Sequence, residues 1–152
     1  MIKNIIDLHM HSGYSDDGEF KPSVLVQMCK DAGLKYIAGA DHNSVKGVEE
    51  AVNKGEELGV KVITAIEIDC TYEGVNLHVL GYYIDYNLKE FGELEENILK
   101  QEKKASPERL RLVEETGIYV NRDKLSKIAK NGIIIGEDIA EASVYEPENK
   151  DN

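Results

Sequence analysis

The sequence predicts an α/β fold in which the strands form part of a β/α barrel or of a layered sheet. In residues 1–85, short apolar strands alternate with amphipathic helices, and repeated strand–helix–strand units imply parallel pairing. Residues 86–152 are rich in charge and helical in pattern, and only about four strands precede them. A closed β/α barrel of the usual size needs more strands. We therefore expect a partial barrel in residues 1–85, followed by a helical segment in residues 86–152.

The expected strands are four apolar runs: 5–8, 36–40, 60–68 and 75–84. The third is almost continuously apolar, as expected for a strand that helices cover on both faces. Glu73 and Gly74 form a turn after it, so the fourth run is predicted to be its hairpin partner.

The expected helices of the first part are 22–32 and 45–58. Pro22 occupies the first turn of one and Gly33 follows its end, while Gly59 ends the other. In the second part we expect a helix over 88–116, with a kink or restart near Pro107, and short helices over 122–130 and about 138–142.

Charge and composition exclude several classes of protein. The 29 acidic and 18 basic residues give a net charge of −11, which argues against a protein that coats nucleic acid through a basic surface. Bound metal ions can invert the local field, so a metal-dependent enzyme for phosphorylated substrates is compatible with this charge. No run approaches the ~18 apolar residues of a membrane span, and no signal peptide is evident. Cys29 and Cys70 form no disulfide framework, so we expect a cytoplasmic protein with no membrane partner.

All four histidines lie in or directly after predicted strands. Side chains of a strand alternate between its faces, so Asp7, His9 and His11 project to the same side if the strand continues through them. Two imidazoles with this spacing can reach one metal ion, although a hydrogen-bonded histidine pair is the alternative.

Further candidate ligands follow the same pattern. Asp41-His42 ends the strand 36–40, at the edge where α/β proteins hold their ligands; the alternative is a helix start capped by Asp41 or Asn43. Glu67 closes the apolar run VITAIE, where a carboxylate is costly unless it is paired or metal-bound; the alternative is an exposed acid at a strand end.

Taken alone, His78 is equally compatible with a histidine of the core, and Asp16 and Asp17 with turn residues. Together, these nitrogen and oxygen groups suit Mn, Fe or Zn, and their number predicts more than one ion.

The runs DLHMHSGYSDDGEF, GADHNSVKGVEEA, ITAIEID and HVLGYYID resemble the polymerase and histidinol phosphatase (PHP) superfamily. The resemblance is greatest to its bacterial metal-dependent phosphoesterases, which act on nucleotides or short nucleic acids. It covers residues 1–85 with specific motifs and continues more loosely through GIYVNRDKLSKIAKNGIIIGEDIAEA, which is similar to that family's helical insertion over the active site. The resemblance implies a distorted β/α barrel in which two or three divalent ions (Mn, Zn or Fe) activate water for attack on a phosphoester.

The resemblance also implies roles for individual residues. Its metal ligands would be His9, His11, Asp16, His42, Glu67 and His78, with Asp17 as the substitute for Asp16. Glu67 would bridge ions, and Asp7 and Asp41 would support catalysis from behind the ligands. Arg109 and Arg111, with Lys103 and Lys104, could hold a substrate phosphate, although the residues favour the alternative, a solvated face of an amphipathic helix.

One departure from the family is clear: no histidine follows His78, whereas the family has a later His and a closing Asp-x-His. This predicts an incomplete metal cluster and an open barrel. The expected function is hydrolysis of a small phosphorylated substrate, such as a nucleotide or an oligonucleotide end. The alternative is a non-catalytic, shortened PHP module for metal binding or protein contact. A homo-oligomer that covers the open sheet edge would reconcile the two.

Overall fold

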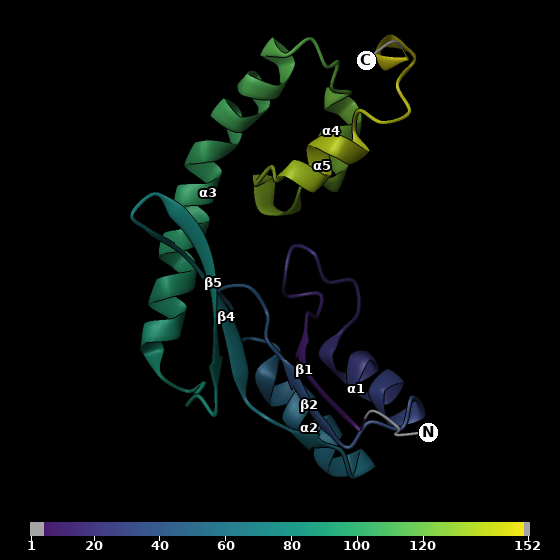
Figure 1. The fold of residues 1–152 in the computed structure, drawn as a ribbon, viewed down its shortest axis with the longest axis vertical. Helices are drawn as coiled ribbons and strands as arrows, with labels where there is room; N and C mark the ends of the chain where they lie inside the picture. Colours follow the sequence, from purple (N-terminus) through teal and green to yellow (C-terminus); the bar gives the residue numbers. More distant parts are fainter. Residues whose placement is uncertain (1–4, 151–152) are drawn as a thin grey trace. The chain divides into compact units, whose positions relative to one another are not determined.

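The computed structural model describes residues 5–150 and has a mixed α/β fold (Figure 1). Its first 85 residues contain, in order, β1 (Ile6–Met10), α1 (Pro22–Asp31), β2 (Tyr36–Gly39), α2 (Val48–Leu58), β3 (Lys61–Val62), β4 (Ala65–Tyr72) and β5 (Val75–Tyr82). The expected alternation of strands and helices is confirmed. The described strands form an open arrangement rather than a closed barrel.

The remaining elements are helical: α3 (Lys89–Glu115), α4 (Arg122–Ile128), η1 (Lys130–Gly132), α5 (Gly136–Glu141) and η2 (Pro147–Asn149). The chain divides into two compact units, residues 1–95 and 96–152, so the division falls within α3. We refer to them as the first and second unit. None of the described helices is long and apolar enough to cross a membrane.

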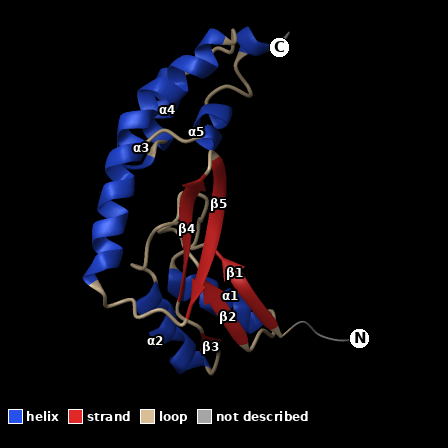
Figure 2. Cartoon of the chain, turned by 60° about the vertical axis from the view of Figure 1, so that its left-hand side comes forward, coloured by secondary structure: helices blue, strands red, loops and turns tan. Residues whose placement is uncertain are grey.

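The first unit is built on a parallel sheet in the order β1-β2-β3 (Figure 2). One core joins this sheet to both helices, with Val26 from α1, Ile37 from β2, Ala51 from α2 and Val62 from β3. A second, smaller core contains Ala38, Ala40 and Ala65. Parallel strands that run side by side bring their carboxyl ends to a common edge, and this edge carries the candidate site.

The expectation of one strand over residues 60–68 is wrong. β3 pairs in parallel with β2, whereas β4 pairs antiparallel with β5 in a separate two-stranded sheet. The chain leaves the parallel sheet at Thr64, whose hydroxyl donates to the carbonyl of Ile84 and whose own carbonyl accepts from the amide of Tyr83. The predicted hairpin between the third and fourth apolar runs is confirmed.

Two helix expectations also need correction. The helix predicted to start at Val45 begins at Val48, and the preceding residues form the turn that leads from the site into α2. α3 continues through Pro107 without a restart. The hydroxyl of Ser106, the residue before the proline, donates to the carbonyl of Glu102 one turn earlier at 2.8 Å.

The second unit has its own core. Leu110 of α3 packs with Val120, Leu125 of α4 and Ile139 of α5. Asn121 caps α4, because its side-chain oxygen accepts from the amide of Lys124 at 3.0 Å.

Gly55 of α2 provides a test of this packing. A Cβ at this position would lie 2.5 Å from Cγ2 of Val62 and 2.7 Å from the carbonyl oxygen of Val60. We expect Gly55→Ala to lower the free energy of unfolding by about 2 kcal/mol, because a backbone carbonyl cannot move aside cheaply. Gly92→Ala is the matched control, since no described atom lies within 4 Å of its Cβ. It should stabilise α3 by roughly 0.5–1 kcal/mol. Urea denaturation measures both, and equal effects would contradict the packing of α2 on β3.

Candidate metal centre

The four histidines of the chain come together at the carboxyl edge of the sheet. His9 lies in β1 and His11 directly after it, His42 follows β2, and His78 lies in β5. Their rings form a chain of neighbours, with centroids 5.0 Å apart from His9 to His11, 4.7 Å from His11 to His42 and 5.0 Å from His42 to His78.

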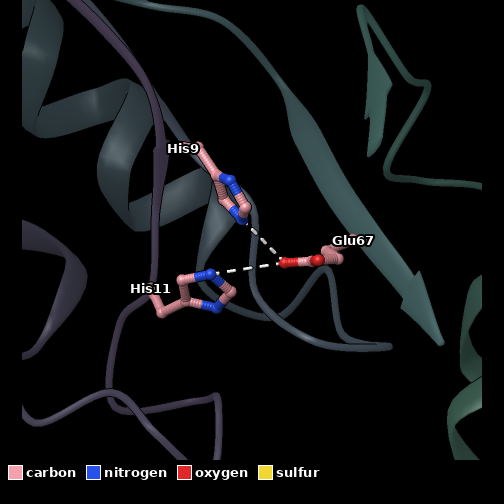
Figure 3. Close-up of side chains that lie close together, drawn as sticks. All are labelled: His9, His11 and Glu67. Carbon is pink, nitrogen blue, oxygen red and sulfur yellow. Dashed lines mark hydrogen bonds and ion pairs between the residues drawn. The ribbon is translucent and has the colours of Figure 1, made fainter. Parts of the chain in front are cut away.

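Glu67 of β4 lies at the centre of this group, and its side chain is buried. Oε2 is 2.8 Å from Nε2 of His9 and 3.3 Å from Nε2 of His11 (Figure 3). Oε1 is 2.9 Å from Nδ1 of His78. A buried carboxylate that contacts several imidazoles is the arrangement that divalent cations use in proteins.

A parallel β-bridge explains how β4 reaches the histidines. His42 and Glu67 pair as an isolated bridge, in which the amide of Glu67 donates to the carbonyl of Asp41 at 3.2 Å. The amide of Asn43 donates in turn to the carbonyl of Glu67 at 2.7 Å. The start of β4 thus extends the parallel sheet beyond the end of β2.

Two further carboxylates, those of Asp69 and Asp17, lie beside His42. Nδ1 of His42 lies 2.8 Å from Oδ1 of Asp69, and Nε2 of His42 lies 3.8 Å from Oδ2 of Asp17. Asp17 also approaches His11, with 3.4 Å between Oδ1 and Nδ1.

Three groups of potential ligand atoms therefore exist within the described residues, each with its atoms within 4.8 Å of one another. They are His9–His11–Glu67, His11–Asp17–His42 and His42–Asp69–His78. All donors are imidazole nitrogens or carboxylate oxygens, which are common ligands of divalent metal ions. The donor set therefore fits divalent metal ions.

The loop between β1 and α1 is tied to the end of β2 by serines. The side chain of Asp41 accepts from both the amide and the hydroxyl of Ser12. The hydroxyl of Ser15 accepts from the amide of His42 at 3.0 Å and lies 3.2 Å from Nδ1 of His11. These bonds hold the loop that carries Asp17 against two of the histidines.

The electrostatics of the site favour ionised carboxylates beside the histidines. Burial raises the pKa of Glu67, but hydrogen bonding from His9 and the charge of His42 outweigh it, and the net pKa is lowered. For Asp69, burial likewise raises the pKa, and hydrogen bonds from His42 and Asn43 bring it below its ordinary value. Burial dominates at Asp41 and raises its pKa despite the bonds from Ser12.

The other residues that the sequence predicts for the site belong to none of the three ligand groups. Asp7 is exposed, and its Oδ1 accepts from the amide of His9 at 3.2 Å. Asp16 is an exposed residue of the loop that belongs to none of the three ligand groups, whereas its neighbour Asp17 belongs to one. Arg109 bonds to Glu102 and to the carbonyl of Ile134, and Arg111 pairs with acids of its own helix.

Asp69 and Asn43 are site residues for which the sequence analysis proposed no ligand role. Asp69 stands two residues after Glu67, so strand alternation places both carboxylates on the same face of β4. That spacing was the available signal. The sequence suggests Asn43 only as a helix cap, whereas in the structure its side chain donates to the carboxylate of Asp69.

His42 makes the stability of the metal-free protein depend on pH. The hydrogen bond to Asp69 raises its pKa from 6.5 to about 9. Because the folded pKa exceeds the unfolded one, the stabilisation is fully present below pH 6.5 and is lost as pH rises through about 9. With chelator present, we expect a loss of roughly 2 kcal/mol over this range. Urea denaturation at successive pH values measures it. His42→Asn should remove most of the slope, and an unchanged slope would contradict the assignment.

Comparisons with known proteins agree with this geometry. A model of the PHP domain family matches residues 7–134. The 5'-3' exoribonuclease of Haemophilus influenzae is 37% identical over 79 residues, which are 52% of this chain and 28% of that enzyme.

Two solved structures share the fold. An amidohydrolase from Chromobacterium violaceum superposes with a TM-score of 0.72 at 23% identity, covering 91% of this chain and 49% of that one. A candidate metal-dependent phosphoesterase from Bifidobacterium adolescentis gives a TM-score of 0.68 at 28% identity, covering 94% and 52%. The chain thus spans about half the length of each of these two proteins.

Proposed function

The chain belongs to the PHP domain family, and from this premise we propose that it is part of a metal-dependent phosphoesterase acting on nucleotides or short nucleic-acid ends. The observation that carries the proposal is the position of Glu67, a buried carboxylate whose oxygens lie within 4 Å of all four histidines. The similarity to a candidate metal-dependent phosphoesterase and to an exoribonuclease supports the substrate class.

Each residue would have a distinct task. His9, His11, Glu67, His42 and His78 would hold the ions, and the loop acid would be Asp17, with Asp16 as the alternative. When bound, such ions lower the pKa of water and stabilise charge on a phosphoryl group. Asp41 would keep the loop in place through Ser12, and Asp7 would restrain the backbone at His9. We propose Mn, Zn or Fe, in two or three positions, as the ions.

Arg109 and Arg111 contribute to substrate binding only if they leave their present partners. Arg109 is engaged by Glu102, and Arg111 by Glu108 and Glu115. A solvated, ion-paired helix face already accounts for Arg111, and Arg109 also donates to the carbonyl of Ile134 within the second unit.

The test begins with metal content per chain, measured by elemental mass spectrometry on protein purified without chelator. We expect two or more equivalents of Mn, Fe or Zn, and a clear decrease in His9→Ala/His11→Ala. Glu49→Ala/Asn53→Ala changes two exposed residues of α2 and should leave the metal content unchanged.

The same three proteins are then incubated with a nucleoside bisphosphate, a 5'-phosphorylated RNA and a 5'-phosphorylated DNA, and phosphate or nucleotide release is measured. Release that needs His9 and His11 supports the proposal. Release that persists in the double variant overturns it. Metal binding without turnover on any substrate would instead favour the alternative, a non-catalytic metal-binding module.

An apolar face of the hairpin supports a further part of the proposal, a second copy of this chain at the open edge. Val75, Leu77 and Val79 alternate along β5 and are exposed, as is Tyr72 opposite Val75. Exposed apolar patches mark surfaces for protein contact, and the unpaired backbone of an open sheet edge invites pairing with another chain. A strictly monomeric mass in light scattering at high concentration would exclude it.

A further inference from the structure

Both carboxylate oxygens and the backbone amide of Asp69 make hydrogen bonds. Oδ1 lies 2.8 Å from Nδ1 of His42, and Oδ2 accepts from Nδ2 of Asn43 at 2.8 Å. Its backbone amide donates to Oδ1 of Asn43 at 2.9 Å. Asn43 and Asp69 therefore form a reciprocal pair, and the remaining carboxylate oxygen faces the imidazole of His42.

The backbone of Asn43 shows that this pair is held firmly. Asn43 is buried and has a φ of 57°, in the left-handed region that residues other than Gly adopt rarely. Asn tolerates this conformation better than most residues. The amide of Asn43 donates to the carbonyl of Glu67 at 2.7 Å. Both the backbone and the side chain of Asn43 thus attach to β4, one to Glu67 and the other to Asp69.

This attachment determines which nitrogen of the His42 ring faces Asp69 and which faces the other carboxylates of the site. Oδ1 of Asp69 lies 2.8 Å from Nδ1 of His42 while Asn43 holds Oδ2, so this carboxylate is placed to accept the Nδ1 proton of the ring and to leave Nε2 as the nitrogen for a metal. The other nitrogen, Nε2, lies 3.8 Å from Oδ2 of Asp17 and 3.8 Å from Oε2 of Glu67. The lone pair of the neutral ring therefore points toward these two carboxylates.

We propose that Asp69, held by Asn43, is a positioning residue that orients His42 with Nε2 toward the metal centre and is not itself a ligand. The inference rests on the proposed function, in which His42 holds an ion. The competing interpretation takes Asp69 as a ligand with His42 and His78. It is disfavoured because His42 and Asn43 already engage the two oxygens of Asp69. A carboxylate behind a ligating histidine is worth 10–100-fold in metal affinity.

The first experiment titrates Zn²⁺ and Co²⁺ into the full chain, with Asp69→Ala and Asp69→Asn as variants. We expect Asp69→Ala to bind the same number of ions with an affinity about 10–100-fold lower, and with the Co²⁺ absorption bands unchanged. Asp69→Asn should lie between, because its amide oxygen can accept from Nδ1 of His42 but its NH₂ opposes that of Asn43. Glu73→Gln, which removes a charge at the exposed tip of the same hairpin, should match the wild type.

A ligand role would give a different result. Both Asp69 variants would then lose one equivalent of metal or change the Co²⁺ bands, which would overturn the proposal. Unchanged affinity in Asp69→Ala would overturn it as well.

A second experiment does not depend on bound metal. Long-range ¹H–¹⁵N spectra of the labelled protein, recorded with chelator and with Zn²⁺, should show a slowly exchanging proton on Nδ1 of His42 that disappears in Asp69→Ala. Its absence from the wild type in both states would overturn the proposal. If wild-type protein binds no ion but shows this proton, the proposed function fails and the orienting role of Asp69 stands.

Discussion

Replacing Glu67 with Gln is expected to weaken Zn²⁺ or Mn²⁺ binding at least ~100-fold, and phosphoester hydrolysis by a similar or larger factor. Glu67 is only 2% exposed, and its two oxygens face His9, His11 and His78. Gln has nearly the same volume, so packing is preserved. Its amide, however, carries no charge, and it places an NH₂ group where an oxygen now faces an imidazole nitrogen.

The control for Glu67→Gln is Glu56→Gln, which removes one charge from an exposed position on α2. Competition titration with a chromophoric chelator measures the affinity of both. Circular dichroism of the metal-free proteins should be the same for the wild type and both variants. Wild-type affinity and stoichiometry in Glu67→Gln would show that this carboxylate is not a ligand, and the site would then have to be centred on Asp17 and Asp69.

Much of the site could be predicted because strand geometry is local. His9 and His11 are two residues apart at the end of β1, and Asp41-His42 follows the end of β2. Parallel pairing brings such ends to one edge of the sheet without any further information. This accounts for His9, His11 and His42. Glu67, near the start of β4, joins them through its bridge with His42, and His78 follows through the antiparallel pairing of β5 with β4.

The break between β3 and β4 could not be predicted from the apolar pattern. Residues 60–68 are almost continuously hydrophobic, and hydrophobicity alone does not distinguish one strand from two. At the break, the hydroxyl of Thr64 donates to the carbonyl of Ile84 and the carbonyl of Thr64 accepts from the amide of Tyr83, and both partners are distant in the sequence.

The sequence pattern also does not decide which of Asp16 and Asp17 faces the histidines. Asp16 and Asp17 are adjacent, and both suit a turn. Their orientation depends on how the loop is folded against β1. A Cβ on Gly18 would lie 1.8 Å from the carbonyl oxygen of Ser12, so the chain passes closer there than any side chain allows. That contact and the bonds of Ser15 bring Asp17 into a ligand group.

Replacing Asp41 with Ala is expected to lower the free energy of unfolding of the metal-free protein by about 3 kcal/mol or more. Asp41 is 5% exposed, and its carboxylate accepts from both the amide and the hydroxyl of Ser12, which is itself only 2% exposed. Alanine would leave two buried donors of Ser12 without an acceptor, and the cost of an unsatisfied buried donor exceeds the net value of the bond it lost.

Asp41→Asn separates this structural role from a catalytic one. Its amide retains one acceptor for Ser12, so we expect roughly half the loss of stability seen with alanine. Asp31→Ala is the control, because the one described bond of the Asp31 side chain is an exposed bond from Gln27, and its loss should cost less than ~0.5 kcal/mol. Urea denaturation gives all three values.

The carboxylate of Asp41 accepts hydrogen bonds from Ser12, and none of its described bonds comes from a histidine of the candidate metal centre. Its effect on metal binding should therefore follow the loss of loop stability, and wild-type stability with lost metal binding would instead place Asp41 among the ligands.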